Sequence, residues 1–130
     1  MYNLLSQETE KLAKEIVDIS IKVHKEIGPG LLESVYEKCF CHDLKKRNIP
    51  FERQVCVDIV YDNELIISEA LRLDILVNKE IIIELKAQEN FHPVWEAQLL
   101  SYLKLSKIRL GFLINFHVPL MKNGIKRIIL

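Results

Sequence analysis

The sequence predicts an α/β fold, and the spacing of its apolar residues is the reason. From Ser6 to Asn48 apolar residues recur every three or four positions, as on the buried face of a helix. The spacing then changes to every second position, as in strands with one buried face. A helical spacing returns at Pro93, and two more strand-like runs follow it. The predicted order is ααβββαββ, which is that of an α/β fold.

The composition is that of an ordinary globular protein. The 130 residues fit one domain spanning positions 1–130, with 49% hydrophobic and 28% charged residues. Lysine and arginine together number 18, as do aspartate and glutamate, so no overall field draws the chain to nucleic acid or to a membrane surface. The three cysteines lack the paired spacing of a zinc site, and no apolar run reaches the roughly 18 residues of a membrane span. We expect a cytoplasmic protein that makes no membrane contact.

Two helices are expected at the start of the chain. Residues 6–27 carry an apolar stripe and begin with Ser6, whose hydroxyl suits the N-cap of a helix. The Gly-Pro-Gly sequence at residues 28–30 breaks the pattern and ends this helix. A second apolar stripe runs from Leu31 to about Asn48. The two segments therefore predict a helical hairpin.

Three strands are expected after the helices. The first alternates over residues 54–59 and leads into a turn at residues 62–63. The second covers residues 65–77, with an irregularity near residues 68–70, and the third covers residues 81–87. These strands follow one another closely enough to form antiparallel hairpins.

The last part of the chain predicts one helix and two strands. Pro93 suits the first turn of a helix that runs to about residue 106. Residues 109–116 and 125–130 have strand character, and a loop at residues 119–124 separates them. The run from Ile125 to Leu130 is apolar enough to form an edge strand that pairs with a second copy or with another protein.

The stretch from Leu71 to Gln88 holds three charges in an otherwise apolar hairpin. A two-residue turn would pair Leu73 with Glu84 and place a carboxylate on the apolar face, at a cost on the order of several kcal/mol. A three-residue turn, or a two-residue turn with a bulge, avoids this cost. The resulting register pairs Val77 with Ile81, Ile75 with Ile83 and Leu73 with Leu85. This register assumes that the side chains of Leu71, Leu73, Ile75 and Val77 share one face of the strand.

The same register sets Asp74 opposite Glu84, with Lys86 two residues further along. Two carboxylates this close repel each other unless a positive group lies between them. A divalent cation is one solution, because carboxylate oxygens suit Mg²⁺ or Mn²⁺. The alternative is a buried ion-pair network in which Arg72 and Lys86 neutralise the two acids. The spacing alone leaves both interpretations open.

The arrangement of Asp74 followed by Glu84-Leu85-Lys86 resembles the D-(x)n-ExK signature of the PD-(D/E)xK nuclease superfamily. Leu73 stands where that signature has proline, a departure that many members of the superfamily share. On the next predicted helix, Gln98 and Tyr102 resemble the QxxxY element of the RecB-like branch. They lie one turn apart, so both side chains can face one cleft.

The second helix carries another resemblance. Gly30, Glu33 and Tyr36, in the sequence GLLESVYE, resemble the signature of the small bacterial GxxExxY proteins, which are placed in the same superfamily. This resemblance covers nearly the whole chain, through NFHVPLMKNGIKRI near its end. The hydroxyl of Tyr36 could reach Glu33, while its ring suits the inner face of the helix.

The resemblance implies a restriction-endonuclease-like core, a mixed β-sheet flanked by helices, with its site on the central hairpin. The implied metal ligands are Asp74, Glu84, the backbone carbonyl of Leu85 and, directly or through water, Glu33. The implied catalytic residues are Lys86, which would orient or activate the attacking water, and Gln98 and Tyr102, which would position Lys86 or the phosphate. One or two metal ions supply the activated water and charge stabilisation that phosphodiester hydrolysis needs.

The implied activity is Mg²⁺- or Mn²⁺-dependent hydrolysis of phosphodiester bonds in DNA, or in RNA. The rival interpretation is a catalytically inactive module of the same fold that binds nucleic acid or a protein partner. The zero net charge and the small size favour this rival. A third interpretation is a homodimer or heterodimer formed through residues 125–130.

Several other residue types allow more than one interpretation. The four histidines lack the spacing of a zinc site, although His92 could border the cleft. Phe91 and Trp95 suit either the core or stacking on a base. Basic residues gather at 45–47, 104–109 and 122–127, either as solvated ends of helices and strands or as local phosphate contacts.

Overall fold

The computed structural model describes residues 4–130, so residues 1–3 of the expected domain lie outside it. Its elements follow the predicted order, with a short 3₁₀ helix added in the loop before the last strand. They are α1 (Gln7–Ile27), α2 (Glu33–Lys46), β1 (Phe51–Tyr61), β2 (Leu65–Val77), β3 (Ile81–Lys86), α3 (Pro93–Ser106), β4 (Leu110–Asn115), η1 (Met121–Asn123) and β5 (Ile125–Ile129). The predicted α/β class is confirmed.

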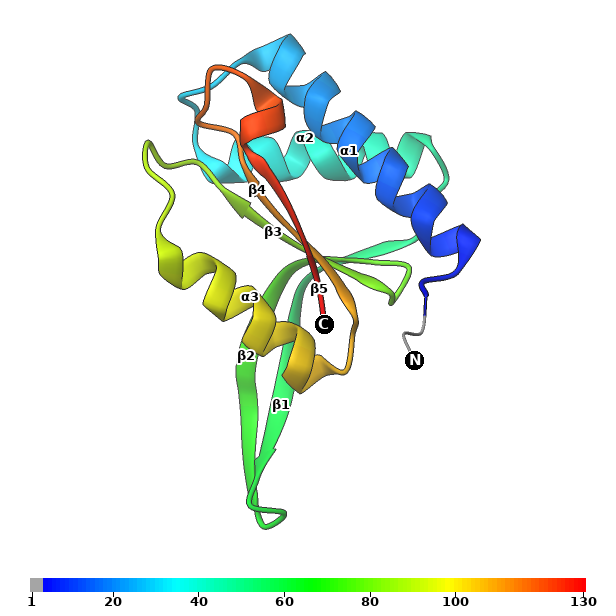
Figure 1. Ribbon diagram of the computed structural model, residues 1–130, viewed down its shortest axis with the longest axis vertical. Helices are drawn as coiled ribbons and strands as arrows, with labels where there is room; N and C mark the ends of the chain where they lie inside the picture. Colours follow the sequence, from blue (N-terminus) through cyan, green and yellow to red (C-terminus); the bar gives the residue numbers. More distant parts are fainter. Residues whose placement is uncertain (1–3) are drawn as a thin grey trace.

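The strands form one mixed sheet in the order β1-β2-β3-β4-β5 (Figure 1). Neighbouring strands are antiparallel except β3 and β4, which are parallel and are joined through α3. One face of the sheet packs against α1 and α2, through residues that include Ile81, Ile83 and Leu85. The other face packs against α3, through residues that include Ile82 and Leu113. This architecture is consistent with a restriction-endonuclease-like core.

The helix ends match the sequence signals. The hydroxyl of Ser6 accepts a hydrogen bond from the backbone N–H of Thr9 and caps α1, which ends at Gly28 with φ +74°. His92 caps α3, because its Nδ1 accepts a hydrogen bond from the N–H of Val94. His92 therefore has a structural role at the start of the helix.

The β1–β2 hairpin contains the predicted turn and irregularity. Asp62 and Asn63 both have φ +55°, the left-handed conformation of a tight hairpin turn. The pairing of β1 with β2 shifts between Val57 and Ile59, opposite residues 68–70. Glu69 adopts φ +51° there, and its N–H donates to Oδ1 of Asp58 at 2.8 Å. The irregularity is thus a bulge held by a side chain.

The β2–β3 turn has the predicted three residues, Asn78 to Glu80, and the pairs Val77–Ile81 and Ile75–Ile83 form as expected. The predicted pair Leu73–Leu85 was wrong. Leu73 packs in the cluster beneath α3, whereas Ile75, two residues later, packs in the cluster beneath α1 and α2. Leu85 also packs beneath α1 and α2, so Leu73 and Leu85 lie in different clusters, and the ladder between β2 and β3 ends before it reaches them.

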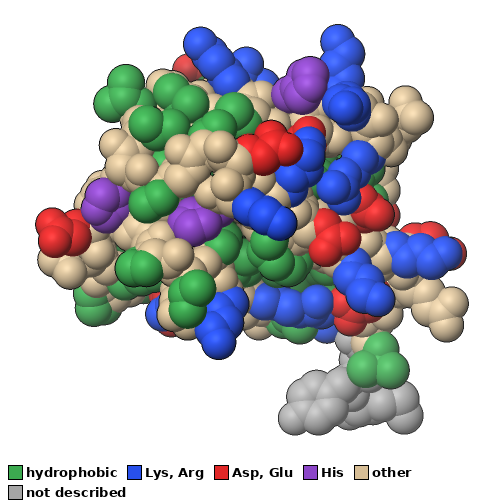
Figure 2. All heavy atoms as spheres, turned by 90° about the horizontal axis from the view of Figure 1, so that it is seen from above, with side chains coloured by type: hydrophobic (Ala, Val, Ile, Leu, Met, Phe, Trp, Pro, Cys, Tyr) green, Lys and Arg blue, Asp and Glu red, His purple; other side chains and the backbone are tan. Residues whose placement is uncertain are grey.

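Charges of both signs are mixed on the surface. Figure 2 shows Lys and Arg side chains interspersed with Asp and Glu over the face seen from above. Several members of the basic groups are paired: Arg47 with Glu15, Lys126 with Glu96 and Arg127 with Glu10. Across residues 4–130 no helix is long and apolar enough to span a membrane.

The sharp return from β4 to β5 requires glycine at position 124. A Cβ there would overlap the carbonyl oxygen of Asn115 and lie 2.9 Å from Cγ2 of Val118. We predict that Gly124→Ala lowers the free energy of unfolding by about 2 kcal/mol, since the backbone must move to admit the methyl group. Urea denaturation measures this change. The control is Asn123→Ala, at the exposed residue next to Gly124. An equal loss of unfolding free energy in both variants would contradict the explanation.

Candidate active site on the β2–β3 hairpin

Two acidic side chains bridge β2 and β3 at the point where the strands separate. The backbone N–H of Asp74 donates to Oε1 of Glu84 at 3.2 Å, and the N–H of Leu85 donates to Oδ2 of Asp74 at 2.9 Å. Each carboxyl group therefore bonds to the backbone of the opposite strand. The bridges replace the β-ladder beyond the pair Ile75–Ile83. They also bring the two acidic side chains together, although the ladder that the register predicted at this point does not form.

Burial and mutual repulsion keep a proton on this acid pair. Burial raises the pKa of Glu84, the charge of Asp74 raises it further, and the result is about 9. Burial also raises the pKa of Asp74, although its bonds to the N–H of Leu85 and to Glu84 oppose the change. Near neutral pH the pair therefore shares a proton between its carboxyl groups.

Lys86 follows Glu84 on the same face of β3. Its Nζ lies 5.4 Å from the centre of the Trp95 ring, a cation–π arrangement. Trp95 is 7% exposed and packs in the cluster beneath α3, so its ring supports the lysine instead of offering a surface to a base. The positive charge of Lys86 also lowers the pKa values of Asp74 and Glu84. The lysine is thus held beside the acid pair.

Glu33 reaches the same region from the first turn of α2. Partial burial raises its pKa, the nearby Asp74 adds to the increase, and Lys86 opposes it. The loop before α2 sets this position. Gly30 has φ +91°, and the hydroxyl of Tyr36 donates to the carbonyl of Gly28 at 2.6 Å and accepts from the N–H of Leu31 at 3.1 Å. The hydroxyl therefore fastens the loop and does not bond to Glu33.

From the opposite face, α3 contributes Tyr102. Its ring packs against the cluster beneath α3, which includes Leu73 of β2 and Ile82 of β3. Burial raises the pKa of its hydroxyl, and the carboxylates of Glu84 and Asp74 raise it further. Gln98 lies one turn earlier on α3 and is exposed. It forms no hydrogen bond with the residues that the structure describes. The structure thus brings together Asp74, Glu84, Lys86, Glu33 and Tyr102, and leaves Gln98 facing solvent.

Three further residues support this site, and the sequence did not indicate them. Asn115 is fully buried and binds the chain directly after Lys86: its Nδ2 donates to the carbonyl of Gln88 at 2.8 Å, and its Oδ1 accepts from the N–H of Gln88. Glu37, one turn after Glu33, is neutralised by Arg53 at 2.5 Å. These contacts join residues far apart in the sequence, so local spacing contains no signal for them.

The ion-pair alternative is not what forms. Among residues 4–130, neither Asp74 nor Glu84 makes an ion pair with Arg72 or Lys86. The acids instead bond to backbone N–H groups of the opposite strand. The two acids therefore lie together with Lys86 nearby, and this arrangement favours the binding of a cation between them.

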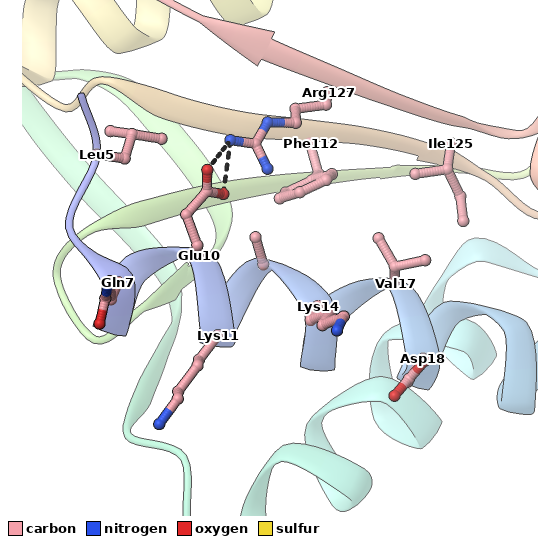
Figure 3. A pocket seen from close by; sticks show the side chains of 11 residues that line it. Leu5, Gln7, Glu10, Lys11, Lys14, Val17, Asp18, Phe112, Ile125 and Arg127 are labelled. Atoms are coloured by element: carbon pink, nitrogen blue, oxygen red, sulfur yellow. Dashed lines mark hydrogen bonds and ion pairs between the residues drawn. The ribbon is translucent and has the colours of Figure 1, made fainter. Parts of the chain in front are cut away.

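A separate hollow of about 860 Å³ lies between α1 and strands β4 and β5 (Figure 3). Its apolar lining includes Val17, Phe112 and Ile125, and the ion pair between Glu10 and Arg127 spans it. None of the acid pair, Lys86 or Tyr102 lines this hollow. We therefore place the candidate site at the hairpin, where the titratable groups converge.

Comparison with known proteins assigns the chain to a family. A family model described as the PD-(D/E)XK nuclease superfamily matches residues 10–128. The chain belongs to this superfamily. A search of curated proteins and a search of solved structures found no match. The superfamily assignment predicted from the sequence is confirmed, and the narrower GxxExxY and RecB-like assignments remain predictions.

PD-(D/E)XK nucleases generally use divalent metal ions, and the acid pair fits one. Within residues 4–130 no group of three or more His, Cys, Asp or Glu side chains is arranged to hold a metal. Mg²⁺, however, usually takes one or two carboxylates from a protein and keeps several waters. The carboxyl groups of Asp74 and Glu84 supply such hard oxygen donors, and their shared proton marks a place where positive charge is favourable.

We predict that Glu84→Gln stabilises the metal-free protein at neutral and alkaline pH. The folded chain keeps the Glu84 proton up to about pH 9, whereas an unfolded chain releases it near the ordinary value of 4.5. The free energy of unfolding of the unaltered protein therefore falls as pH rises between these values. Glutamine remains neutral, so we expect a gain of about 1–3 kcal/mol at about pH 8.

Urea denaturation in the presence of a chelator, from about pH 5 to about pH 9, measures the effect. The exposed Glu52 on β1 provides the matched control, Glu52→Gln. The prediction fails if Glu84→Gln and Glu52→Gln have the same pH dependence.

Proposed function

We propose that the chain is a metal-dependent nuclease that hydrolyses phosphodiester bonds in DNA or RNA. The observation that supports it is the reciprocal bridge between Asp74 and Glu84 with Lys86 held beside it. This is the geometry in which the D-(x)n-ExK signature has its expected function. The match to the nuclease superfamily over residues 10–128 supports the reaction class.

The roles we propose follow from position and charge. Asp74, Glu84 and the backbone carbonyl of Leu85 would hold Mg²⁺ or Mn²⁺. Glu33, which is exposed and forms no three-acid cluster with them within residues 4–130, would reach the ion through water. The bound ion supplies an activated water and stabilises negative charge on the phosphate. Lys86 orients the attacking water and offsets the charge that develops on the phosphate oxygens.

The α3 helix would position the substrate. Tyr102, half-buried beside the acids, can donate its hydroxyl proton to a phosphate oxygen or to a water. Gln98, exposed one turn away, is free to meet a phosphate or to turn towards Lys86. These roles correspond to the QxxxY element, and the loop fastened by Tyr36 corresponds to the GxxExxY signature. We therefore propose the RecB-like branch and the GxxExxY family for this chain.

One observation favours a second candidate function, a nuclease-fold module that binds without cutting. The acid pair consists of two carboxylates, Glu33 is exposed, and no third acidic ligand completes a cluster in the part of the chain described. A site with two carboxylates binds a metal weakly, so such a module would hold nucleic acid or a protein without hydrolysis. Metal binding and cleavage must therefore be measured separately.

We predict that the purified chain cleaves end-labelled DNA or RNA when Mg²⁺ or Mn²⁺ is added, and that a chelator stops cleavage. Lys86→Ala should fold normally and lose activity by about a hundredfold or more, because the charge beside the reacting phosphate is removed. Lys79→Ala, at the exposed turn of the same hairpin, is the matched control and should keep full activity.

Substrates should include single-stranded, duplex and branched DNA and single-stranded RNA. No cleavage of any of them with either metal would contradict the proposal.

We further predict that calorimetry detects Mn²⁺ binding to the unaltered chain and none to Asp74→Ala, because the remaining carboxylate cannot hold the ion alone. Thermal denaturation of Asp74→Ala checks that the variant is folded. Retained nucleic-acid binding with no Mn²⁺ binding and no cleavage would select the binding module instead.

A further inference from the structure

The β1–β2 hairpin extends beyond the rest of the sheet as a two-stranded ribbon (Figure 1). We call residues 58–70 the arm. Within it β1 pairs with β2 through Ile59–Ile67, Val60–Ile66 and Tyr61–Leu65, while β2 joins β3 only later, at residues 75–77. Below the arm, Val55 and Val57 pack against the cluster beneath α3. The ribbon thus continues an apolar face past the point where α3 covers it.

The arm exposes large apolar side chains on both of its faces. The exposed fractions are 60% for Val60, 67% for Tyr61, 55% for Leu65, 68% for Ile66 and 41% for Ile67. Side chains alternate between the faces, so the pair Val60–Ile66 lies on one face. The pairs Ile59–Ile67 and Tyr61–Leu65 lie on the opposite face. An isolated two-stranded hairpin is marginally stable in water, and a contiguous apolar patch marks an interaction surface.

The arm is also strongly acidic. Asp58, Asp62, Glu64 and Glu69 lie between Cys56 and Leu71, a segment that contains no lysine or arginine. None of the four forms an ion pair with any residue of the described part of the chain. An acidic apolar surface repels nucleic acid and anionic lipid, so its complement is a basic surface of a protein.

This chain carries such a basic surface beside the base of its own arm, next to Val55 and Val57. We call this region the foot of the arm. Lys104 and Lys107 are exposed at the end of α3, and Arg109 follows them. The first two form no ion pair within residues 4–130, and Arg109 bonds to the carbonyl of Leu130. The end of α3 lies at the foot because Val55 and Val57 pack with Leu103 and Ile108.

We propose that two copies of the chain form a twofold dimer through their arms. The arms lie antiparallel, and the face in contact is the one that continues from Val55 and Val57 and holds the pairs Ile59–Ile67 and Tyr61–Leu65. Asp62 and Glu64 at the tip of one arm meet Lys104 and Lys107 of the partner subunit. A twofold interface needs one surface that is complementary to itself. The arm meets this requirement because its apolar stripe has an acidic tip at one end and a basic foot at the other. The pairing uses neither β5 nor the acid pair.

Sedimentation and light scattering of the full chain, over a range of concentrations, test the proposal. We expect a dimer that Leu65→Asp converts to a monomer, because a charge then enters the apolar contact. Leu120→Asp is the matched control: Leu120 is a similarly exposed apolar residue, at 57%, in the loop before η1. This variant should remain dimeric. Denaturation curves confirm that both variants are folded.

Charge exchange tests the orientation of the two arms. The double variant Asp62→Lys, Glu64→Lys and the double variant Lys104→Glu, Lys107→Glu should each weaken the dimer about tenfold or more. Combining all four substitutions in one chain should restore it. A monomeric unaltered chain at every concentration, a dimer unaffected by Leu65→Asp, or no restoration in the fourfold variant would overturn the proposal.

Discussion

The crossed bonds between Asp74 and Glu84 determine what this fold can do. Where β2 and β3 separate, backbone N–H groups lose their ladder partners, and unpaired buried N–H groups are costly. The two carboxyl groups accept from those N–H groups at 3.2 and 2.9 Å. The same bonds that complete the sheet therefore force two acids together in a buried place. One set of hydrogen bonds therefore completes the backbone pairing and also forms the candidate catalytic site.

The rest of the molecule is arranged around that contact. The parallel pairing of β3 with β4 sends the chain over the opposite face through α3, so Tyr102 approaches the acids from one side while α2 brings Glu33 from the other. Asn115, at the end of β4, holds the backbone after Lys86. Each contributor stands on a regular element, which favours a rigid site.

Much of this could be predicted from the sequence, for identifiable reasons. The three-residue turn and the approach of Asp74 to Glu84 followed from burying Ile75, Val77, Ile81 and Ile83 together, a local constraint with one good solution. The side of the sheet taken by Leu73 could not be predicted, because strand twist depends on which partners a strand keeps. Likewise, the Glu37–Arg53 pair and the clamp by Asn115 join distant segments, so spacing gives no indication of either.

The ring of Tyr36 stacks on that of Phe116 with centroids 4.4 Å apart and planes 2° from parallel. The aromatic pair couples the loop that begins α2 to the segment after β4, near the other end of the chain. A growing polypeptide emerges from the ribosome in sequence order. The stacking contact that holds the loop before Glu33 can therefore form only after Phe116 has been synthesised.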